Sequence, residues 1–325
     1  MSTESDEWAT PEGIRPRRVD VSFDLDRALS SVVSLRAEIP DDAFTAENLG
    51  TERRGHGVVI DDDGLVLTIG YLITEAQTIW LRTNAGTAVP GFAMAYDQES
   101  GFGLVKALAP LGVPALPLGS ARDVARNDTV IVAGHGGLRH ALKARLVGKR
   151  EFAGYWEYLL DEALFTAPAI LQWSGAAMID LAGRLVGIGA LLVQEGVEGE
   201  DRQVNMMVPI DLLAPILPSM LSTGRASGPV RPWLGLYAAE SDSRVVIAGV
   251  ADNGPARRAG LKQSDLVLEV NGNRVNTLAG FLRAVWATGD AGSPIPLKIA
   301  RSGDVLRVVI DSMDRHDMLL RPRLH

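Results

Sequence analysis

Short apolar runs separated by turn residues fill the chain from Gly57 to Val147. The runs are 58–60, 65–68, 78–82, 91–95, 104–107, 129–133 and 144–147. Strands of this length at this spacing predict an all-β barrel. The same pattern continues with 158–164, a hairpin of 178–179 and 185–192, and a last strand at 204–210. The chain up to residue 210 is therefore expected to be mainly β.

A second pattern follows this strand-rich region. Asp211 is expected to cap a helix over 212–221, despite Pro215 and Pro218 within it. Beyond residue 229, a strand and turn at 266–272 precede Thr277, which is placed to cap another helix. The apolar residues of that helix follow i, i+3, i+4, i+7 spacing, and strands at 295–300 and 305–310 form a hairpin around the turn 301–304.

These patterns divide the chain into two domains. Residues 1–26 mix charge, proline and glycine, and predict a mobile tail. The first domain covers 27–222, with a loop at 37–54, and residues 223–229 form a Gly/Ser/Pro linker. The second domain covers 230–314 and is followed by a C-terminal tail, 315–325.

Composition and charge indicate which binding partners are not expected and in which cellular compartment the chain is expected. A formal net charge of -8 and a pI near 5.2 argue against nucleic acid or an anionic membrane as partner. The chain has no cysteine, so disulfides and thiolate chemistry are excluded. The acidic start lacks the features of a secretory signal, and no apolar run is long enough to span a membrane. Together these features predict a cytoplasmic location.

A serine in a tight turn carries the candidate chemistry. Ser174-Gly175 precedes the apolar hairpin of 178–192, as the nucleophile does in chymotrypsin-like folds. The hairpin that starts at Gly55-His56-Gly57 and the segment 97–107 resemble the regions around the catalytic histidine and aspartate of HtrA-type serine proteases. Residues 231–236, Arg-Pro-Trp-Leu-Gly-Leu, resemble the carboxylate-binding loop of a PDZ domain. The resemblance covers 28–313 and implies a two-barrel chymotrypsin-like protease fold followed by a PDZ domain.

The positions that match the catalytic triad depart from the HtrA pattern. Tyr71 stands where the resemblance implies the histidine, and Gly101 stands where it implies the aspartate. A phenol with a pKa of about 10 is a poor base at neutral pH. Gln172 replaces the glycine whose amide contributes to the oxyanion hole, and Trp173 follows it. Only Ser174 matches the triad.

Other bases are weaker candidates. His56 in the first hairpin and His135 in a glycine-rich loop are histidines that a migrated base would use. Lys143 and Lys149 are the lysines nearest to Ser174 along this part of the chain, but they show no motif of a Ser-Lys dyad. No His/Asp/Glu spacing suggests a metal ion, and no cofactor is expected.

The PDZ-like module keeps the pattern of a peptide-binding site. Such domains add a ligand strand to a sheet edge, and loop amides hold the terminal carboxylate. The resemblance implies that the loop residues Trp233, Leu234, Gly235 and Leu236 and the helix residues Phe281, Leu282 and Val285 form this site. Some of the helix residues are also expected in the core.

The sequence therefore favours a catalytically inactive HtrA-like protein. It would bind C-terminal peptides or partner proteins through the PDZ groove and the former substrate cleft, as an adaptor, regulator or chaperone. The alternative is an active endopeptidase that uses Ser174 with a non-standard base. A third interpretation is a structural subunit in a homo-oligomer or in a hetero-assembly with an active relative.

Overall fold

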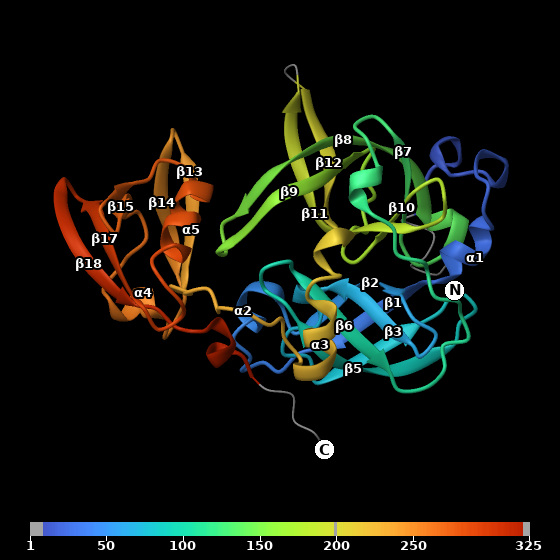
Figure 1. The fold of residues 1–325 in the computed structure, drawn as a ribbon, viewed down its shortest axis with the longest axis horizontal. Coiled ribbons are helices and arrows are strands. Elements are labelled where there is room, and N and C mark those ends of the chain that lie inside the picture. The colour runs from blue at the N-terminus through green and yellow to red at the C-terminus, as the bar shows by residue number, and fades with distance from the viewer. Residues whose placement is uncertain (1–8, 198–199, 321–325) are drawn as a thin grey trace. The chain divides into compact units, whose positions relative to one another are not determined.

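The computed structural model describes residues 9–197 and 200–320, and the chain divides into two compact units (Figure 1). The first unit comprises Met1–Arg150, Glu162–Ser227 and Leu320–His325. The second comprises Glu151–Asp161 and Gly228–Leu319. The boundary at residues 227 and 228 falls within the predicted linker. The inclusion of 151–161 in the second unit differs from the predicted division, which assigned these residues to the protease-like domain.

The first barrel closes in the order β1-β2-β3-β6-β5-β4. Its strands are β1 (Val32–Glu38), β2 (Glu52–Val59), β3 (Leu65–Ile69), β4 (Thr78–Arg82), β5 (Ala88–Tyr96) and β6 (Phe102–Ala107). All five residues of β3 are buried, and β1 alternates toward its end between buried and exposed positions. Alternation of this kind is expected where one face of a strand lines the barrel interior.

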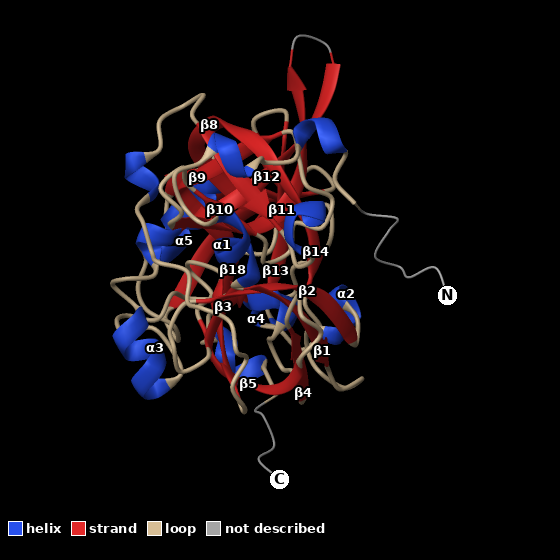
Figure 2. Cartoon of the chain, turned by 90° about the vertical axis from the view of Figure 1, so that its right-hand side faces the viewer, coloured by secondary structure: helices blue, strands red, loops and turns tan. Residues whose placement is uncertain are grey.

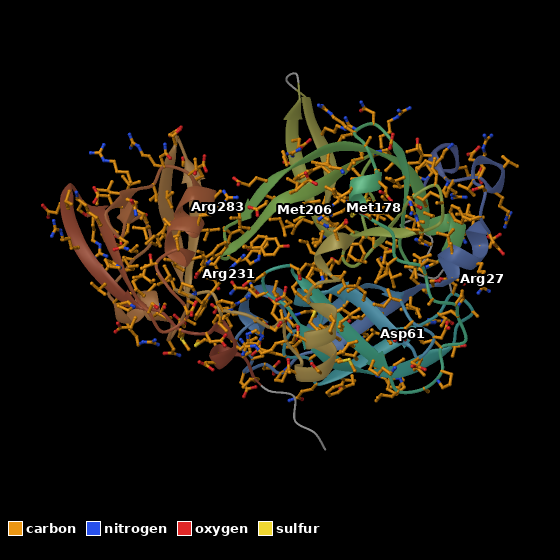
Figure 3. The ribbon with its side chains drawn as sticks, in the orientation of Figure 1. Arg27, Asp61, Met178, Met206, Arg231 and Arg283 are labelled. Carbon is orange, nitrogen blue, oxygen red and sulfur yellow. The ribbon has the colours of Figure 1, made fainter. Side chains whose placement is uncertain are left out.

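The second barrel closes in the order β10-β11-β12-β9-β8-β7. Its strands are β7 (Thr129–Ala133), β8 (Ala141–Gly154), β9 (Tyr158–Ala167), β10 (Ala177–Ile179), β11 (Leu185–Val197) and β12 (Glu200–Pro209). Met178 and Met206, labelled in Figure 3, lie on β10 and β12 and are fully buried. The strands dominate the described chain and the helices are short, as Figure 2 shows.

The second unit contains a sheet in the order β13-β14-β15-β17-β18, with β16 paired to β15. Its strands are β13 (Leu236–Ser241), β14 (Arg244–Val250), β15 (Leu266–Val270), β16 (Asn273–Arg274), β17 (Pro294–Arg301) and β18 (Asp304–Asp311). The unit also contains two helices, α4 (Pro255–Arg258) and α5 (Leu278–Trp286). Thr277 caps α5 as predicted, because its side chain accepts a hydrogen bond from the amide of Gly280.

The N-terminal segment differs from the predicted mobile tail. The amide of Thr10 donates to the carbonyl of Arg139 at 2.8 Å, and Lys143 pairs with Asp20 at 3.1 Å. The described part of this segment leads into α1 (Leu25–Ser30), which Asp24 caps. The charge and proline content of residues 9–24 therefore reflects turns with fixed contacts to the barrel, not a lack of structure.

Three further segments differ from prediction. The expected loop at 37–54 contains the short helix α2 (Ala46–Leu49) and the start of β2. The helix expected at 212–221 is replaced by a 3-10 turn, Ile210–Leu212, and by α3 (Leu217–Thr223). Pro218 lies in the first turn of α3, where its missing N–H costs nothing. Part of the expected C-terminal tail forms a 3-10 helix, Arg315–Met318, and residues 321–325 of that tail lie outside the described residues.

Candidate functional site

Ser174 lies in a tight turn immediately before β10. Gly175 has a φ of +76°, and its amide donates to the carbonyl of Gly189 at 2.8 Å. The carbonyl of Ser174 accepts the amide of His56 at 2.8 Å. The turn is therefore held from both sides by backbone hydrogen bonds.

The glycines around this turn have a steric role of their own. A Cβ atom on Gly175 would lie 1.9 Å from the carbonyl oxygen of His56, and one on Gly189 would lie 2.1 Å from that of Trp173. A Cβ atom on Gly55 would lie 2.7 Å from the carbonyl oxygen of Ser174. Neighbouring backbone carbonyls therefore approach these three positions so closely that a side chain does not fit, and this requirement for glycine is independent of whether Ser174 is reactive.

The hydroxyl of Tyr71 contacts the hydroxyl of Ser174. Tyr71 lies in the 3-10 helix Gly70–Leu72 that follows β3, and its phenol oxygen is 2.8 Å from the Oγ of Ser174 and 2.8 Å from the carbonyl oxygen of Ala190. A phenol has one hydrogen and a carbonyl can only accept. When Tyr71 donates to Ala190, the hydrogen of its contact with Ser174 must come from the serine.

Burial raises the pKa of Tyr71 to about 12, and the contact with Ser174 opposes this shift only in part. The phenol therefore stays protonated at neutral pH. A protonated phenol cannot remove the serine proton in the way a catalytic histidine does.

A buried arginine fixes the backbone that carries Tyr71. Arg53, which is 4% exposed, donates to the carbonyl oxygens of Tyr71 and Thr74 at 2.7 and 3.1 Å. A third bond, at 2.7 Å, reaches the hydroxyl of Thr45, which in turn contacts the carboxylate of Glu75 at 2.5 Å. Burial lowers the pKa of Arg53 to about 10, and the charge of Glu75 opposes that shift. Arg53 remains charged at neutral pH and holds the tyrosine in place.

No carboxylate of segment 97–107 contacts Tyr71 in the described hydrogen bonds. Gly101 has a φ of +81° and contributes only backbone, its carbonyl accepting the amide of Gly70 at 2.7 Å. Asp97 instead binds the amide and hydroxyl of Ser100 at 2.8 and 2.6 Å. The carboxylate of Asp97 is therefore used within its own turn.

Gln172 and Trp173 alter the surroundings of the serine. Gln172 is not among the non-glycine residues with positive φ, and its backbone is hydrogen-bonded to the ring of His56. Trp173 packs against the buried cluster of the second barrel. The two residues therefore contact the second barrel and His56 at the position where the resemblance implies a permissive glycine.

The rings of the two histidines considered as alternative bases are hydrogen-bonded to backbone groups. The Nδ1 atom of His56 accepts the amide of His135 at 3.1 Å. Burial lowers the pKa of His56 to about 3, with further lowering from the charges of His135 and His140. Burial also lowers the pKa of His135. His56 therefore contacts Ser174 through its backbone, while its ring binds backbone groups.

The two lysines are also engaged elsewhere. Lys143 pairs with Asp20, and the ammonium of Lys149 donates to the carbonyl of Ala121 at 2.7 Å. Neither contact involves Ser174.

In the second unit, the backbone amides of Leu234, Gly235 and Leu236 converge on one carboxylate. Gly235 has a φ of +71°, which lets consecutive N–H groups point to the same place. The carboxylate belongs to Glu157, at the turn between β8 and β9, and the donor distances to its nearest oxygen are 3.0, 2.8 and 3.1 Å. The sequence pattern predicts this loop but indicates no role for Glu157.

The other residues predicted for the peptide site lie mainly in the core. Phe281, Leu282 and Val285 are at most 1% exposed and belong to the buried cluster of this unit. Trp233 is 7% exposed, and its amide donates to the carbonyl of Met313 at 3.0 Å. The helix residues therefore form part of the core of this unit.

Comparison with known families agrees with both units. Residues 55–188 match a trypsin-like peptidase domain and residues 232–311 match a PDZ domain. The chain is 25% identical to the serine endoprotease DegS of Haemophilus influenzae, over 81% of this chain and 78% of DegS. The chain therefore combines a trypsin-like peptidase domain with a PDZ domain, and its homologues are HtrA-type serine proteases.

Other relatives of this chain are longer. It is 24% identical to a protein of Halomonas elongata named "probable periplasmic serine endoprotease DegP-like", over 84% of this chain and 59% of that protein. Among solved structures, the HtrA-type protease AlgW with decapeptide is similar in fold, with a TM-score of 0.54 and 20% identity over 92% of this chain and 98% of that one. The resemblance inferred from the sequence and the two-barrel-plus-PDZ fold are thus confirmed.

The predicted cytoplasmic location is wrong. The DegP and DegQ relatives are named periplasmic endoproteases, and these names point to the periplasm. The acidic first residues carried the prediction, and they are a weak basis for assigning a compartment. Among the residues that the structure describes, no helix combines the length and apolar character that crossing a bilayer requires.

Proposed function

We propose that this HtrA-type chain is catalytically inactive and binds peptides or partner proteins through its PDZ domain. The contact between the hydroxyls of Tyr71 and Ser174 carries the proposal. This contact supports the proposal because a phenol that stays protonated at neutral pH is a poor base for the serine hydroxyl.

The expected loss of rate is large. Removing members of a catalytic triad lowers turnover by roughly 10⁴ to 10⁶. A damaged oxyanion hole lowers it by a further factor of about 10² to 10³. With Tyr71, Gly101 and Gln172 at the three altered positions, useful proteolysis is not expected.

The binding role rests on the PDZ loop. Its three amides converge and can hold a carboxylate, which is the group that a C-terminal peptide presents. A protein that binds such peptides without cutting them would act as an adaptor, a regulator or a chaperone. Assembly of this chain with itself or with an active relative is a further prediction.

Proteolysis of an unfolded substrate tests the proposal. Wild-type protein and Ser174→Ala are incubated with fluorescein-labelled casein at equal concentration. We expect the same background release of fluorescence from both. A release that depends on Ser174 would support instead an active endopeptidase with an unrecognised base, the activity that the names of the relatives describe.

A further inference from the structure

The carboxylate of Glu157 binds the PDZ loop in the manner of a peptide terminus. Glu157 lies at the turn between β8 and β9 with a φ of +61°, and its side chain is buried. One oxygen accepts the amides of Gly235 and Leu236 at 2.8 and 3.1 Å, and the other accepts that of Leu234 at 3.0 Å. A buried carboxylate that accepts three backbone amides is a built contact of the kind these loops make with a ligand.

The backbone of the same turn also pairs with the sheet. The amide of Ala238 on β13 donates to the carbonyl of Tyr155 at 3.0 Å. The rings of Tyr155 and Tyr237 lie 6.0 Å apart at 56°. A peptide ligand of a PDZ domain makes backbone bonds of this kind when it adds to the sheet edge.

Side chains on both sides of the turn extend the contact to α5. Leu159 is 8% exposed and belongs to the same buried cluster as Phe281 and Val285. Arg283 on α5, labelled in Figure 3, pairs with Glu151 and Asp161, each at 2.5 Å. Residues 151–161 therefore engage the loop, the sheet and the helix that together form a peptide groove.

We propose that residues 151–161 are an internal ligand of the PDZ domain, and that a peptide with a free C-terminal carboxylate binds only after Glu157 has left the loop. This inference rests on the proposed peptide-binding function. Each loop amide has a single hydrogen, so Glu157 and a peptide terminus cannot both be bound. The apparent affinity for a peptide is then the intrinsic affinity reduced by the fraction of molecules with an open loop.

Hydrogen exchange of the loop amides tests the internal contact in the full-length chain without any ligand. The variants are Glu157→Ala, which removes the carboxylate, and Glu157→Gln, which keeps its size and removes its charge. Glu162→Gln, at an exposed position on β9, is the matched control. We expect exchange at residues 234–236 to be at least about tenfold faster in Glu157→Ala, intermediate in Glu157→Gln and unchanged in Glu162→Gln.

Peptide binding tests the second half of the inference. The probe is a pool of fluorescein-labelled peptides with random apolar residues at the last three positions, in free-acid and C-terminally amidated forms. We expect the free-acid pool to bind Glu157→Ala about tenfold more tightly than wild type, and the amidated pool to bind neither. Thermal unfolding shows whether the variants are folded. Peptide binding by Glu157→Gln, which keeps the size of the side chain, then distinguishes release of the loop from a loss of folding.

The outcomes distinguish this inference from the function on which it rests. Equal exchange at residues 234–236 in wild type and in both Glu157 variants would overturn the internal ligand. Equal affinity of wild type and Glu157→Ala for the free-acid pool would overturn the competition. Faster exchange without binding of any peptide would support the internal contact and overturn the peptide-binding function.

Discussion

The phenol oxygen of Tyr71 lies 2.8 Å from the Oγ of Ser174. The chain thus keeps the hydrogen-bonding distance between nucleophile and neighbour that serine catalysis needs, with a group of the wrong acidity. Burial of the phenol raises its pKa further. The group at hydrogen-bonding distance from Ser174 is therefore a phenol that stays protonated at neutral pH.

Removal of the phenol hydroxyl should cost stability. Tyr71→Phe leaves the carbonyl of Ala190, which is 4% exposed, without this donor. We expect the free energy of unfolding to fall by about 1 to 2 kcal/mol, measured by urea denaturation. Tyr155→Phe, at a ring that is 56% exposed, is the control and should change it much less. An unchanged stability of Tyr71→Phe would mean that the contact is not formed in solution.

A histidine at position 71 alone should not restore a reactive serine. Tyr71→His supplies an imidazole, but Gly101 provides no carboxylate to orient it, a defect that costs a factor of about 10⁴ in a working triad. We expect Ser174-dependent hydrolysis of a peptide ester only when Gly101→Asp and Gln172→Gly are added. The φ of +81° at residue 101 is tolerated better by aspartate than by most residues. Full hydrolysis by Tyr71→His alone would show that the other two positions do not matter.

The glycine after Ser174 should be required for folding. In Gly175→Ala the new Cβ would lie 1.9 Å from the carbonyl oxygen of His56, at a φ of +76°. We expect a loss of more than about 3 kcal/mol in the free energy of unfolding. Gly112→Ala has a similar φ of +68° and nothing within 4 Å, so it isolates the backbone strain and should cost only about 1 kcal/mol. Similar losses in the two variants would show that the turn relaxes.

Peptide binding by the wild type should depend on pH through Glu157. Burial raises the pKa of the docked Glu157 carboxyl from 4.5 to about 7, and the loop amides oppose this shift. The docked form therefore binds a proton more tightly than the released form. Docking is strongest below the ordinary pKa and weakens as the pH rises through about 7.

We accordingly expect the affinity for the free-acid peptide pool to rise about tenfold from pH 6 to pH 8, measured by fluorescence anisotropy. Glu157→Gln should abolish that dependence. The pH dependence must be distinguished from the titration of other charged residues on the surrounding elements. These residues are Glu151, Asp161, Arg231, Glu240, Arg257, Arg258 and Arg283. An affinity that falls with rising pH would contradict the assignment to Glu157.

Local patterns predicted the strands well where both ends carry turn residues. The bounds of β4 and β7 agree with the predicted 78–82 and 129–133. The hairpin of β8 and β9 was predicted too short, because its outer part carries polar residues such as Lys149, Arg150 and Glu151. Their pairing depends on contacts that a local apolar pattern does not contain.

The site was only partly predictable for the same reason. Motif order placed Tyr71 and Ser174 in corresponding segments, but the structure was needed to show their hydroxyls in contact across 103 positions. Glu157 resembles any polar residue of an exposed turn. Its burial depends on amides at positions 234–236, some 77 to 79 residues further along the chain, and no spacing rule connects the two.

Labelling with a fluorophosphonate probe, read by intact mass, shows whether the hydroxyl of Ser174 is activated. The probe reports an activated serine without knowledge of the substrate, and Ser174→Ala is the control. We expect no adduct on the wild-type chain at neutral pH. An adduct that disappears in Ser174→Ala would contradict this expectation and direct the search for the base to His56 and His135.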